Sequence, residues 1–406
     1  MVVGGMIGSG IFVMPAQLAP YGWTSIPAWV AAISGALLLA YVLAKLSAAR
    51  PEATGTIAVV GAELGALSGV LVGWAYWVSV WSAIAIIAVT AVRYSAAFVP
   101  ALAATPVALA LWSTALVWLM TLLNLLGARA AGNFQVVTTL LKLLPLIAVV
   151  VIIAGFAATG GEQLTAHSHP AYSPSSLTAA MTLAFYALVG FESASVVAER
   201  VRDPQRNILR ATMIGTGLTG LLYIIVSTGV LFAMPQAVIA AAPAPIALFV
   251  ETFFGRSAGL AIAAFAVIAT VGCLNGWVLM QGEVPLGMAR AGLLPRWMTV
   301  TNQHDVSTRL LAIGSSCASI LILSSAAGSG GLAGLLDFML NLTAATSLLL
   351  YAAACIVAIR IGVTRIAAVL GLAFCCWAMW GSGKAGLLAI VLMLTALPLY
   401  WLRPKG

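Results

Sequence analysis

The segment Val2–Pro15 reads VVGGMIGSGIFVMP, and a second segment, Tyr186–Ser195, reads YALVGFESAS. Both lie inside long apolar runs where a regular helix is otherwise expected. The first holds four glycines, each of which costs about 1 kcal/mol in a helix interior relative to alanine. The second places the carboxyl group of Glu192 in its apolar run. Both segments indicate interrupted helices, and close helix packing through small residues is the alternative for either one alone.

Composition assigns the chain to the membrane. Its 406 residues are 63% hydrophobic and only 7% charged, whereas soluble domains carry about 25% charged residues. At about 20 residues per spanning helix, the length allows about twelve helices and no sizeable domain outside the bilayer. These figures exclude a soluble enzyme, a secreted disulfide scaffold and a nucleic-acid-binding protein. The net charge of +8 is explained by basic loops that orient membrane proteins.

Apolar runs separated by short charged or Gly/Pro-rich pieces predict twelve spans. Their approximate limits are 1–18, 26–47, 67–92, 105–126, 134–158, 176–198, 211–234, 257–285, 308–326, 334–359, 363–381 and 385–402. The first is too short to cross a bilayer, so about 10–15 further apolar residues are expected in front of it.

The positions of lysine and arginine test this division. With the N-terminus inside, the cytoplasmic loops and tail receive fourteen, namely Lys45, Arg50, Arg129, Arg200, Arg202, Arg206, Arg210, Arg290, Arg296, Arg309, Arg360, Arg365, Arg403 and Lys405. The external side receives three, Arg93, Arg256 and Lys384, and only Lys142 lies within a span. Both termini are therefore predicted to be cytoplasmic.

The interrupted segments fall in the first and sixth spans, five helices apart. Breaks at matching positions of two halves are the best sequence indicator of an inverted-repeat transporter site. Unwound backbone survives at mid-membrane depth only where it lines a cavity. It offers amide groups and helix dipoles to a carboxylate, and carbonyl groups to an ammonium. The predicted substrate is therefore an amino acid or a decarboxylated relative.

Three side chains at mid-membrane depth have more than one interpretation. A charge there costs about 3 kcal/mol or more, so Glu192 is either a gate linked to protons or substrate, or a hydrogen-bonding partner of a tyrosine. Lys142 either has a structural role, takes part in the coupling of transport, or extends its ammonium group to the membrane interface. Trp277 either closes over a substrate or packs. Tyrosines at the same depth, which need polar partners, are Tyr76, Tyr186 and Tyr351.

Four motifs are recognisable, namely Gly8-Ser9-Gly10-Ile11-Phe12 with Pro15, Gly190-Phe191-Glu192-Ser193-Ala194-Ser195, Asp203-Pro204-Gln205-Arg206-Asn207, and Gly276-Trp277. With these motifs the chain resembles the amino acid–polyamine–organocation superfamily over essentially its whole length. Within that superfamily it is most similar to the bacterial arginine/agmatine antiporter and to the basic amino acid/polyamine antiporters.

The resemblance implies an all-α, leucine-transporter-like fold of about twelve helices, in which helices 1 and 6 are broken. Residues 1–158 and 176–359 would form two inverted five-helix repeats, and residues 363–402 would add two helices. It also implies a homodimer in the bacterial inner membrane that exchanges an arginine-like amino acid for an amine or another amino acid by alternating access. No enzyme activity, cofactor or metal is expected.

The resemblance also assigns roles to individual residues. The carboxylate would bind at the first break, the α-amine at carbonyl groups near Val189, and a side-chain cation on the Tyr186 ring. The implied substrate-binding residues are Ile7, Gly8, Ser9, Gly10, Ser79, Ile84, Tyr186, Val189, Trp277 and Thr343. The implied gating residues are Tyr76, Glu192, Trp277 and Tyr351.

Three residues depart from the pattern of the arginine/agmatine antiporter. Ile84 and Gly5 stand where asparagines are expected, and Tyr186 stands where a tryptophan would stack on the guanidinium. These changes leave the carboxylate end intact and make the distal pocket drier. A proton-coupled or facilitative permease for neutral amino acids on the same fold is therefore the alternative function. An ion channel is disfavoured because the sequence lacks a repeated filter.

Overall fold

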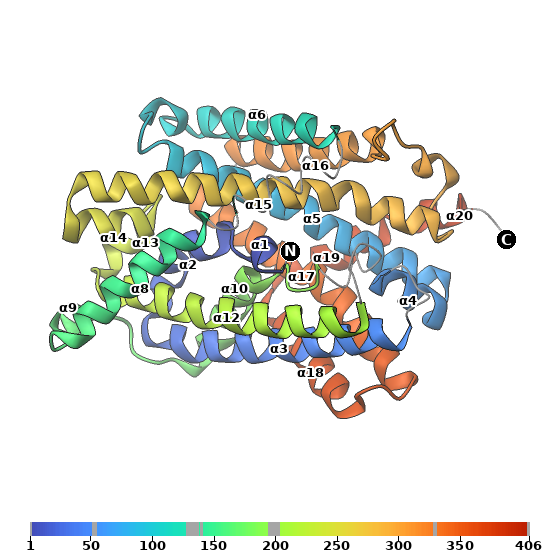
Figure 1. Ribbon diagram of the computed structural model, residues 1–406, viewed down its shortest axis with the longest axis horizontal. Coiled ribbons are helices and arrows are strands. Elements are labelled where there is room, and N and C mark those ends of the chain that lie inside the picture. Colours follow the sequence, from blue (N-terminus) through green and yellow to red (C-terminus); the bar gives the residue numbers. More distant parts are fainter. Residues whose placement is uncertain are drawn as a thin grey trace.

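The computed structural model describes residues 2–50, 55–126, 138, 141–193, 204–327 and 331–403. Every regular element in these residues is a helix, and the longer helices run roughly along one direction (Figure 1). The longer helices are α3 (Ser25–Ala49), α5 (Ala66–Ser95), α6 (Pro106–Asn124), α8 (Leu143–Ala158), α10 (Pro174–Leu188), α12 (Pro204–Phe232), α15 (Arg256–Arg290), α16 (Thr308–Ala327), α17 (Gly331–Arg360), α18 (Arg365–Gly381) and α19 (Lys384–Leu394).

Shorter helices begin the chain and connect the long ones. They are α1 (Val2–Met6), α2 (Ser9–Leu18), η1 (Ala19–Thr24), α4 (Thr56–Leu64), η2 (Pro100–Ala103), α9 (Glu162–Thr165), α13 (Gln236–Ala241), α14 (Pro245–Phe254), η4 (Arg296–Thr299) and α20 (Leu397–Trp401). Of these, α4, α9, α13 and α14 were not predicted, because each is shorter than a membrane span and lies in a connection between spans.

The predicted spans agree with the helices. By length and composition, seven helical segments of the described residues can cross a membrane, and four shorter apolar helices accompany them. Each predicted span coincides with helix in the described residues; residue 1 of the first span, 134–137 and 139–140 of the fifth, and 194–198 of the sixth lie outside them. The prediction of an all-helical, multi-span membrane protein is confirmed.

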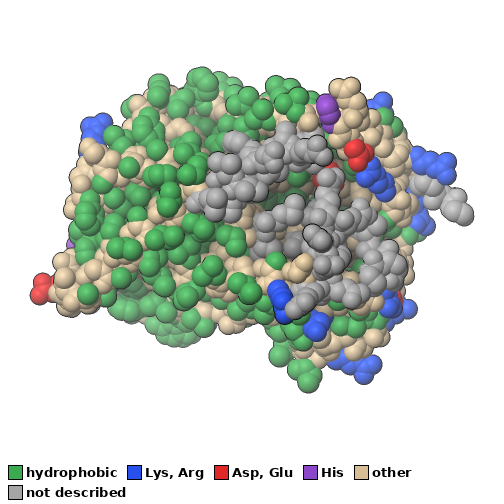
Figure 2. All heavy atoms as spheres, in the orientation of Figure 1, with side chains coloured by type: hydrophobic (Ala, Val, Ile, Leu, Met, Phe, Trp, Pro, Cys, Tyr) green, Lys and Arg blue, Asp and Glu red, His purple; other side chains and the backbone are tan. Residues whose placement is uncertain are grey.

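Helix α5 forms the centre of the molecule, and the outer helices present apolar faces. Of the apolar window of α5, 94% is buried, against 33% for α6. Leu111, Leu119 and Leu122 on α6 are all exposed. Figure 2 shows hydrophobic side chains over much of the visible face away from the end where Lys and Arg gather. Exposed apolar surface of this extent indicates a surface that contacts lipid.

The predicted interruptions are present in both helices. Helix α1 ends at Met6 and α2 begins at Ser9, with Gly8 in an extended conformation (φ −154°, ψ −139°). Helix α10 ends at Leu188, and Gly190 follows at φ +114°, a conformation that glycine adopts without steric cost. Hereafter the first break is residues 7–8 and the second break is residues 189–192.

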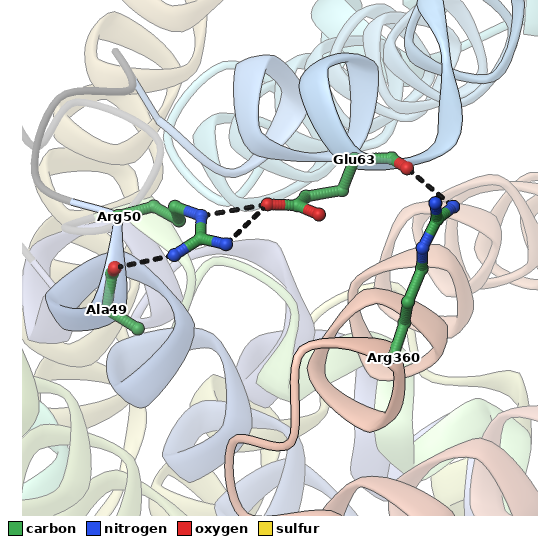
Figure 3. A network of polar contacts seen from close by, with 4 residues as sticks. All are labelled: Ala49, Arg50, Glu63 and Arg360. Carbon is green, nitrogen blue, oxygen red and sulfur yellow. Dashed lines mark hydrogen bonds and ion pairs between the residues drawn. The ribbon is translucent and has the colours of Figure 1, made fainter.

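Basic side chains gather at one end of the molecule, here called the basic end, where the C-terminus lies (Figures 1 and 2). At this end Arg50 forms an ion pair with Glu63 at 2.7 Å, and Arg360 Nη1 donates to the Glu63 carbonyl oxygen at 2.7 Å (Figure 3). These contacts join the ends of α3, α4 and α17. Helices α9, α13 and α14 lie at the opposite end (Figure 1).

Candidate functional site

A small cavity lies between the two breaks. Its volume is about 10 Å³, which is room for about one water molecule. The lining residues come from α1, α2, α5, α10, α15 and α17, and they are Gly5, Met6, Gly8, Ser9, Gly10, Ala83, Ile87, Tyr186, Ala187, Val189, Cys273, Trp277 and Thr343. In this structure the cavity is therefore too small to hold an amino acid or an amine, and in this sense the site is closed.

The start of α2 gives the cavity a positive electrostatic character. No side chain caps this helix, whose N-cap is Gly8, so its first amide groups lack partners within the helix. These groups carry the positive end of the helix dipole. The Ser9 hydroxyl lies 2.9 Å from the Tyr186 hydroxyl. This arrangement suits a carboxylate, which can accept from amide groups and from a hydroxyl.

The α2 start also packs tightly against the neighbouring helices. A Cβ atom on Gly10 would lie 2.7 Å from Ala187 Cα, and one on Gly8 would lie 2.9 Å from Cys273 Cβ. Real Cβ atoms do not approach other atoms this closely. Glycine therefore allows close packing as well as a helix break at this site, so both interpretations of the glycine-rich segment hold.

The carbonyl groups on the other side of the first break are bonded to side chains. Lys142 Nζ donates to the Gly4 carbonyl at 2.7 Å and to the Ile7 carbonyl at 3.0 Å. The Gly5 carbonyl accepts from Trp277 Nε1 at 3.2 Å. The Met6 carbonyl accepts from the Tyr223 hydroxyl at 2.7 Å. Long-range side chains thus replace the hydrogen bonds that a continuous helix would make.

Lys142 does not snorkel to the interface. It is fully buried, with 0% of its surface exposed, and its ammonium group faces the negative end of the short helix α1. The interpretation of Lys142 as a snorkelling side chain is therefore wrong, and it remains a structural or coupling residue.

The second break is organised around Glu192, which is 1% exposed. Its Oε1 accepts from the Tyr76 hydroxyl at 2.8 Å, and its Oε2 accepts from the Gly190 amide at 2.9 Å. The Tyr351 ring packs on Phe191, with ring centroids 5.1 Å apart. The three residues predicted to form the gate, Tyr76, Glu192 and Tyr351, are thus brought together.

The wall formed by α5 differs from the expectation. Ala83 and Ile87 line the cavity, whereas Ser79 and Ile84 do not. Ser79 donates to the Tyr76 carbonyl at 2.6 Å. Ile84 is fully buried, but it follows Ala83 by one residue and is therefore turned by about 100° around the helix.

Other predicted substrate-binding residues lie at the cavity. Trp277 lines it, and so does Thr343, whose hydroxyl lies 2.8 Å from that of Ser82. Ile7 is adjacent to the lining residue Gly8 and contributes its carbonyl to Lys142. Sequence reasoning missed Ala83, Ile87 and Cys273. The first two follow Tyr76 at seven and eleven residues, a spacing that places all three on one helix face.

A bundle of membrane-crossing helices in which two broken helices enclose one cavity is the architecture of a secondary transporter. Residues 1–405 match the amino acid permease family, and the chain belongs to this family. The assignment to the amino acid–polyamine–organocation superfamily is confirmed, and the protein is a multi-span transporter of small molecules rather than an enzyme.

Several proteins named as transporters are similar over most of the chain. The cadaverine/lysine antiporter of Escherichia coli is 31% identical over 401 residues, which cover 95% of this chain and 88% of the relative. A putrescine transporter of Haemophilus influenzae is 28% identical, covering 74% of this chain and 69% of the relative. A putative arginine/ornithine antiporter of Bacillus subtilis is 27% identical, covering 80% and 75%.

A solved structure supports the fold. A Na⁺-coupled sialic acid symporter in a substrate-bound outward-open state matches with a TM-score of 0.55 at 14% identity. The match covers 95% of this chain and 88% of that chain. The leucine-transporter-like architecture expected from the sequence is therefore confirmed, while this similarity carries no information on substrate.

Proposed function

We propose that the protein exchanges a basic amino acid for its decarboxylated amine, or for another amino acid, across the bacterial inner membrane by alternating access. The observation that carries this proposal is the closed cavity between two helix breaks, where uncapped amide groups of α2 face the end of α10. The relatives named as lysine/cadaverine, putrescine and arginine/ornithine carriers support a cationic substrate.

In this proposal the substrate binds across the cavity. Its carboxylate accepts from the Ser9 and Gly10 amides at the start of α2. Its α-ammonium group donates to carbonyl groups around Val189, where α10 ends. A side-chain cation lies against the Tyr186 ring, because a cation is attracted to the face of an aromatic ring. Trp277 closes over the bound molecule.

The gate of the proposed cycle is the Tyr76–Glu192–Tyr351 group. Glu192 bonds both to α5, through Tyr76, and to its own helix break, through Gly190. Opening the site towards the basic end separates these partners and wets the carboxyl. We place that end, and with it the C-terminus, in the cytoplasm, since basic residues collect on that side of the membrane, and we place the N-terminus on the same side.

The wider organisation belongs to the same proposal. Residues 1–158 and 176–359 form the two inverted repeats, residues 363–402 add two helices, and the protein assembles as a homodimer. The matching positions of the two breaks support the repeat, because alternating access moves one repeat against the other around a fixed site.

A neutral amino acid permease is the second candidate, and one observation favours it. The described residues that line the cavity include no carboxylate, and α5 contributes only Ala83 and Ile87 to the wall. A cationic side chain thus finds no ionic partner in the closed cavity and depends on aromatic and backbone groups.

Exchange in proteoliposomes separates the two candidates. Vesicles loaded with lysine, cadaverine, arginine, agmatine or putrescine, or left empty, receive labelled lysine or arginine outside. If the protein is an exchanger, labelled substrate should enter only those vesicles that contain a counter-substrate. Uptake of labelled alanine or leucine into empty vesicles under an imposed pH gradient, without uptake of basic amino acids, would replace exchange by the permease function.

A further inference from the structure

A second and larger cavity lies towards the end opposite the basic end. Its volume is about 550 Å³, within the range of about 300–1,000 Å³ typical of small-molecule pockets. The walls are mostly alanine and proline side chains from α2, α5, η2 and the α13–α14 connection. Arg93 and Gln17 are the polar side chains among the described lining residues.

The two cavities are stacked along the same pair of helices. On α2, Ser9 lines the inner cavity and Gln17 lines the outer one; on α5, the corresponding residues are Ile87 and Arg93. A rise of 1.5 Å per residue separates these levels by about 9–12 Å. The outer cavity is therefore positioned as an antechamber of the closed site.

The contact between the two levels is well defined. The Tyr94 hydroxyl donates to the Phe12 carbonyl at 2.9 Å, and the two rings meet edge to face with centroids 5.5 Å apart. Phe12 lies between the inner and outer lining residues of α2. This pair joins α2 to α5 at a level between the two cavities.

Arg93 is half-buried, and among the described residues it forms no ion pair and donates no hydrogen bond. A guanidinium group has five N–H donors in a fixed planar arrangement that matches a carboxylate. Alanine and proline side chains around it offer neither charge nor acceptor. The outer cavity thus presents a positive charge in surroundings that screen it less than bulk water does.

We propose that the outer cavity is a second substrate-binding site, in which Arg93 binds the carboxylate of an external amino acid before it enters the closed site. This site rests on the proposed exchange function and adds direction to it. An amino acid brings a carboxylate to Arg93, whereas its decarboxylated amine brings only positive charge and is repelled. The outer cavity therefore favours amino acid over amine on the external side.

The test compares Arg93→Gln and Arg93→Lys with a matched control, Arg256→Gln. Arg256 begins α15, is exposed and does not line the cavity, so its substitution removes the same charge from the same predicted side. Each variant is reconstituted with internal lysine, and KM is measured for external lysine together with the inhibition constant of external cadaverine.

Arg93→Gln should raise KM for external lysine about tenfold, the loss expected for one charge-assisted hydrogen bond. The cadaverine inhibition constant should stay unchanged or fall, and the maximal rate and KM for internal lysine should stay unchanged. Arg93→Lys should retain most of the parent's affinity for external lysine, and Arg256→Gln should match the parent.

A measurement on the parent alone covers the case in which Arg93→Gln does not fold. Lysinamide lacks the carboxylate, so both sides of the membrane should prefer lysine to lysinamide. With Arg93 bound to the carboxylate, the external side should show this preference about tenfold more strongly than the internal side. Equal preference on the two sides would overturn the proposal.

Three other outcomes would also overturn it. Equal rises in the lysine and cadaverine constants would make Arg93 structural. An unchanged lysine KM in Arg93→Gln, with exchange intact, would remove the outer site and leave the exchange function standing. An Arg93 effect that appears only with anionic lipid in the vesicles, and not with phosphatidylcholine alone, would assign the guanidinium to a lipid phosphate. Absence of exchange in the parent would instead contradict the proposed function itself.

Discussion

At the first break, backbone carbonyls accept hydrogen bonds from side chains, one of which is the buried ammonium of Lys142. At the second break, a backbone amide donates to the buried carboxylate side chain of Glu192. The buried ionisable side chain thus bonds carbonyl groups beside the first break and an amide group at the second. Both side chains are almost completely buried.

Irregular backbone persists inside the membrane at both breaks because side chains bond its polar groups. Unsatisfied backbone groups cost several kcal/mol each in an apolar medium, and most of the partners come from distant elements. Lys142 lies more than 130 residues from the carbonyls it meets, and Tyr76 lies 116 residues from Glu192. Each break is therefore stabilised by tertiary contacts and can change when those contacts separate.

The largest effect is expected from Lys142→Met. Methionine fills a similar volume but leaves the Gly4 and Ile7 carbonyls, in α1 and at the first break, without their charged donor. We expect the free energy of unfolding to fall by about 3 kcal/mol and exchange to be lost. Thermal unfolding in detergent and exchange in proteoliposomes measure both quantities. Lys384→Met, at an exposed lysine, is the control; an unchanged unfolding temperature for Lys142→Met would show that water replaces the ammonium.

The next largest effect is expected from Trp277→Leu. The indole lines the cavity and donates to the Gly5 carbonyl in α1, beside the first break, at 3.2 Å. Leucine keeps the site apolar but loses the cover over the substrate, so we expect the exchange rate to fall about tenfold or more, corresponding to about 1.4 kcal/mol of lost contact. Trp380→Leu, at a tryptophan that is 84% exposed, controls for lost aromatic area. Near-normal exchange in a folded Trp277→Leu protein would make Trp277 a packing residue.

Glu192→Gln tests the second break with a smaller change. Glutamine keeps the size but cannot ionise: its single oxygen can still accept from the Gly190 amide, while its NH2 group would donate to the Tyr76 hydroxyl instead of accepting from it. The titratable groups that face Glu192 from neighbouring helices are Tyr76 on α5 and Tyr351 on α17. If Glu192 couples opening to protons, the variant should fold and bind substrate, and its pH–rate profile should be flatter than the parent's.

The pH–rate profile is measured from acidic to neutral pH, with a substrate whose ionisation does not change over that range. An unchanged pH dependence in Glu192→Gln would leave Glu192 as a structural hydrogen-bonding residue. The second break would then have only a structural role, and Lys142 would remain as the ionisable residue that could couple transport to protons.

The sequence predicted the fold because its strongest signals are long and repetitive. Apolar runs of spanning length and the separation of lysine and arginine between two sides identify the helices without reference to tertiary contacts. The breaks were also predictable, since glycine-rich backbone and a carboxyl inside apolar runs both conflict with a regular helix. Family resemblance then indicated that Tyr76, Glu192 and Tyr351 meet.

The partners of the breaks were less predictable. Nothing in the local sequence of Lys142 indicates that its ammonium reaches the carbonyls of the first helix, because that contact depends on how α8 packs. The same holds for Tyr223, whose hydroxyl bonds to Met6. On α5, the residues transferred from the family, Ser79 and Ile84, differ from the residues that line the cavity, Ala83 and Ile87, because a residue-by-residue transfer does not fix the rotation of the helix.

The smallest effect is expected from paired substitutions in α5, at the wall of the cavity between the two breaks. These substitutions also test the rotation of α5. Ile87→Ala and Ile84→Ala remove the same side-chain atoms from two buried positions of one helix. Both should lower the free energy of unfolding by about 2–4 kcal/mol, as for other large-to-small changes in a core.

Of the two residues, only Ile87 lines the cavity. Only Ile87→Ala should therefore change the relative KM values of lysine, arginine and leucine, by several-fold, because it enlarges the space in which the substrate side chain lies. Ile84→Ala should keep the parent's order of substrates. The substrate preference could instead change in Ile84→Ala and not in Ile87→Ala. In that case the face of α5 that carries Ile84 contacts the bound substrate, and the wall of the substrate-bound site differs from that of the closed cavity.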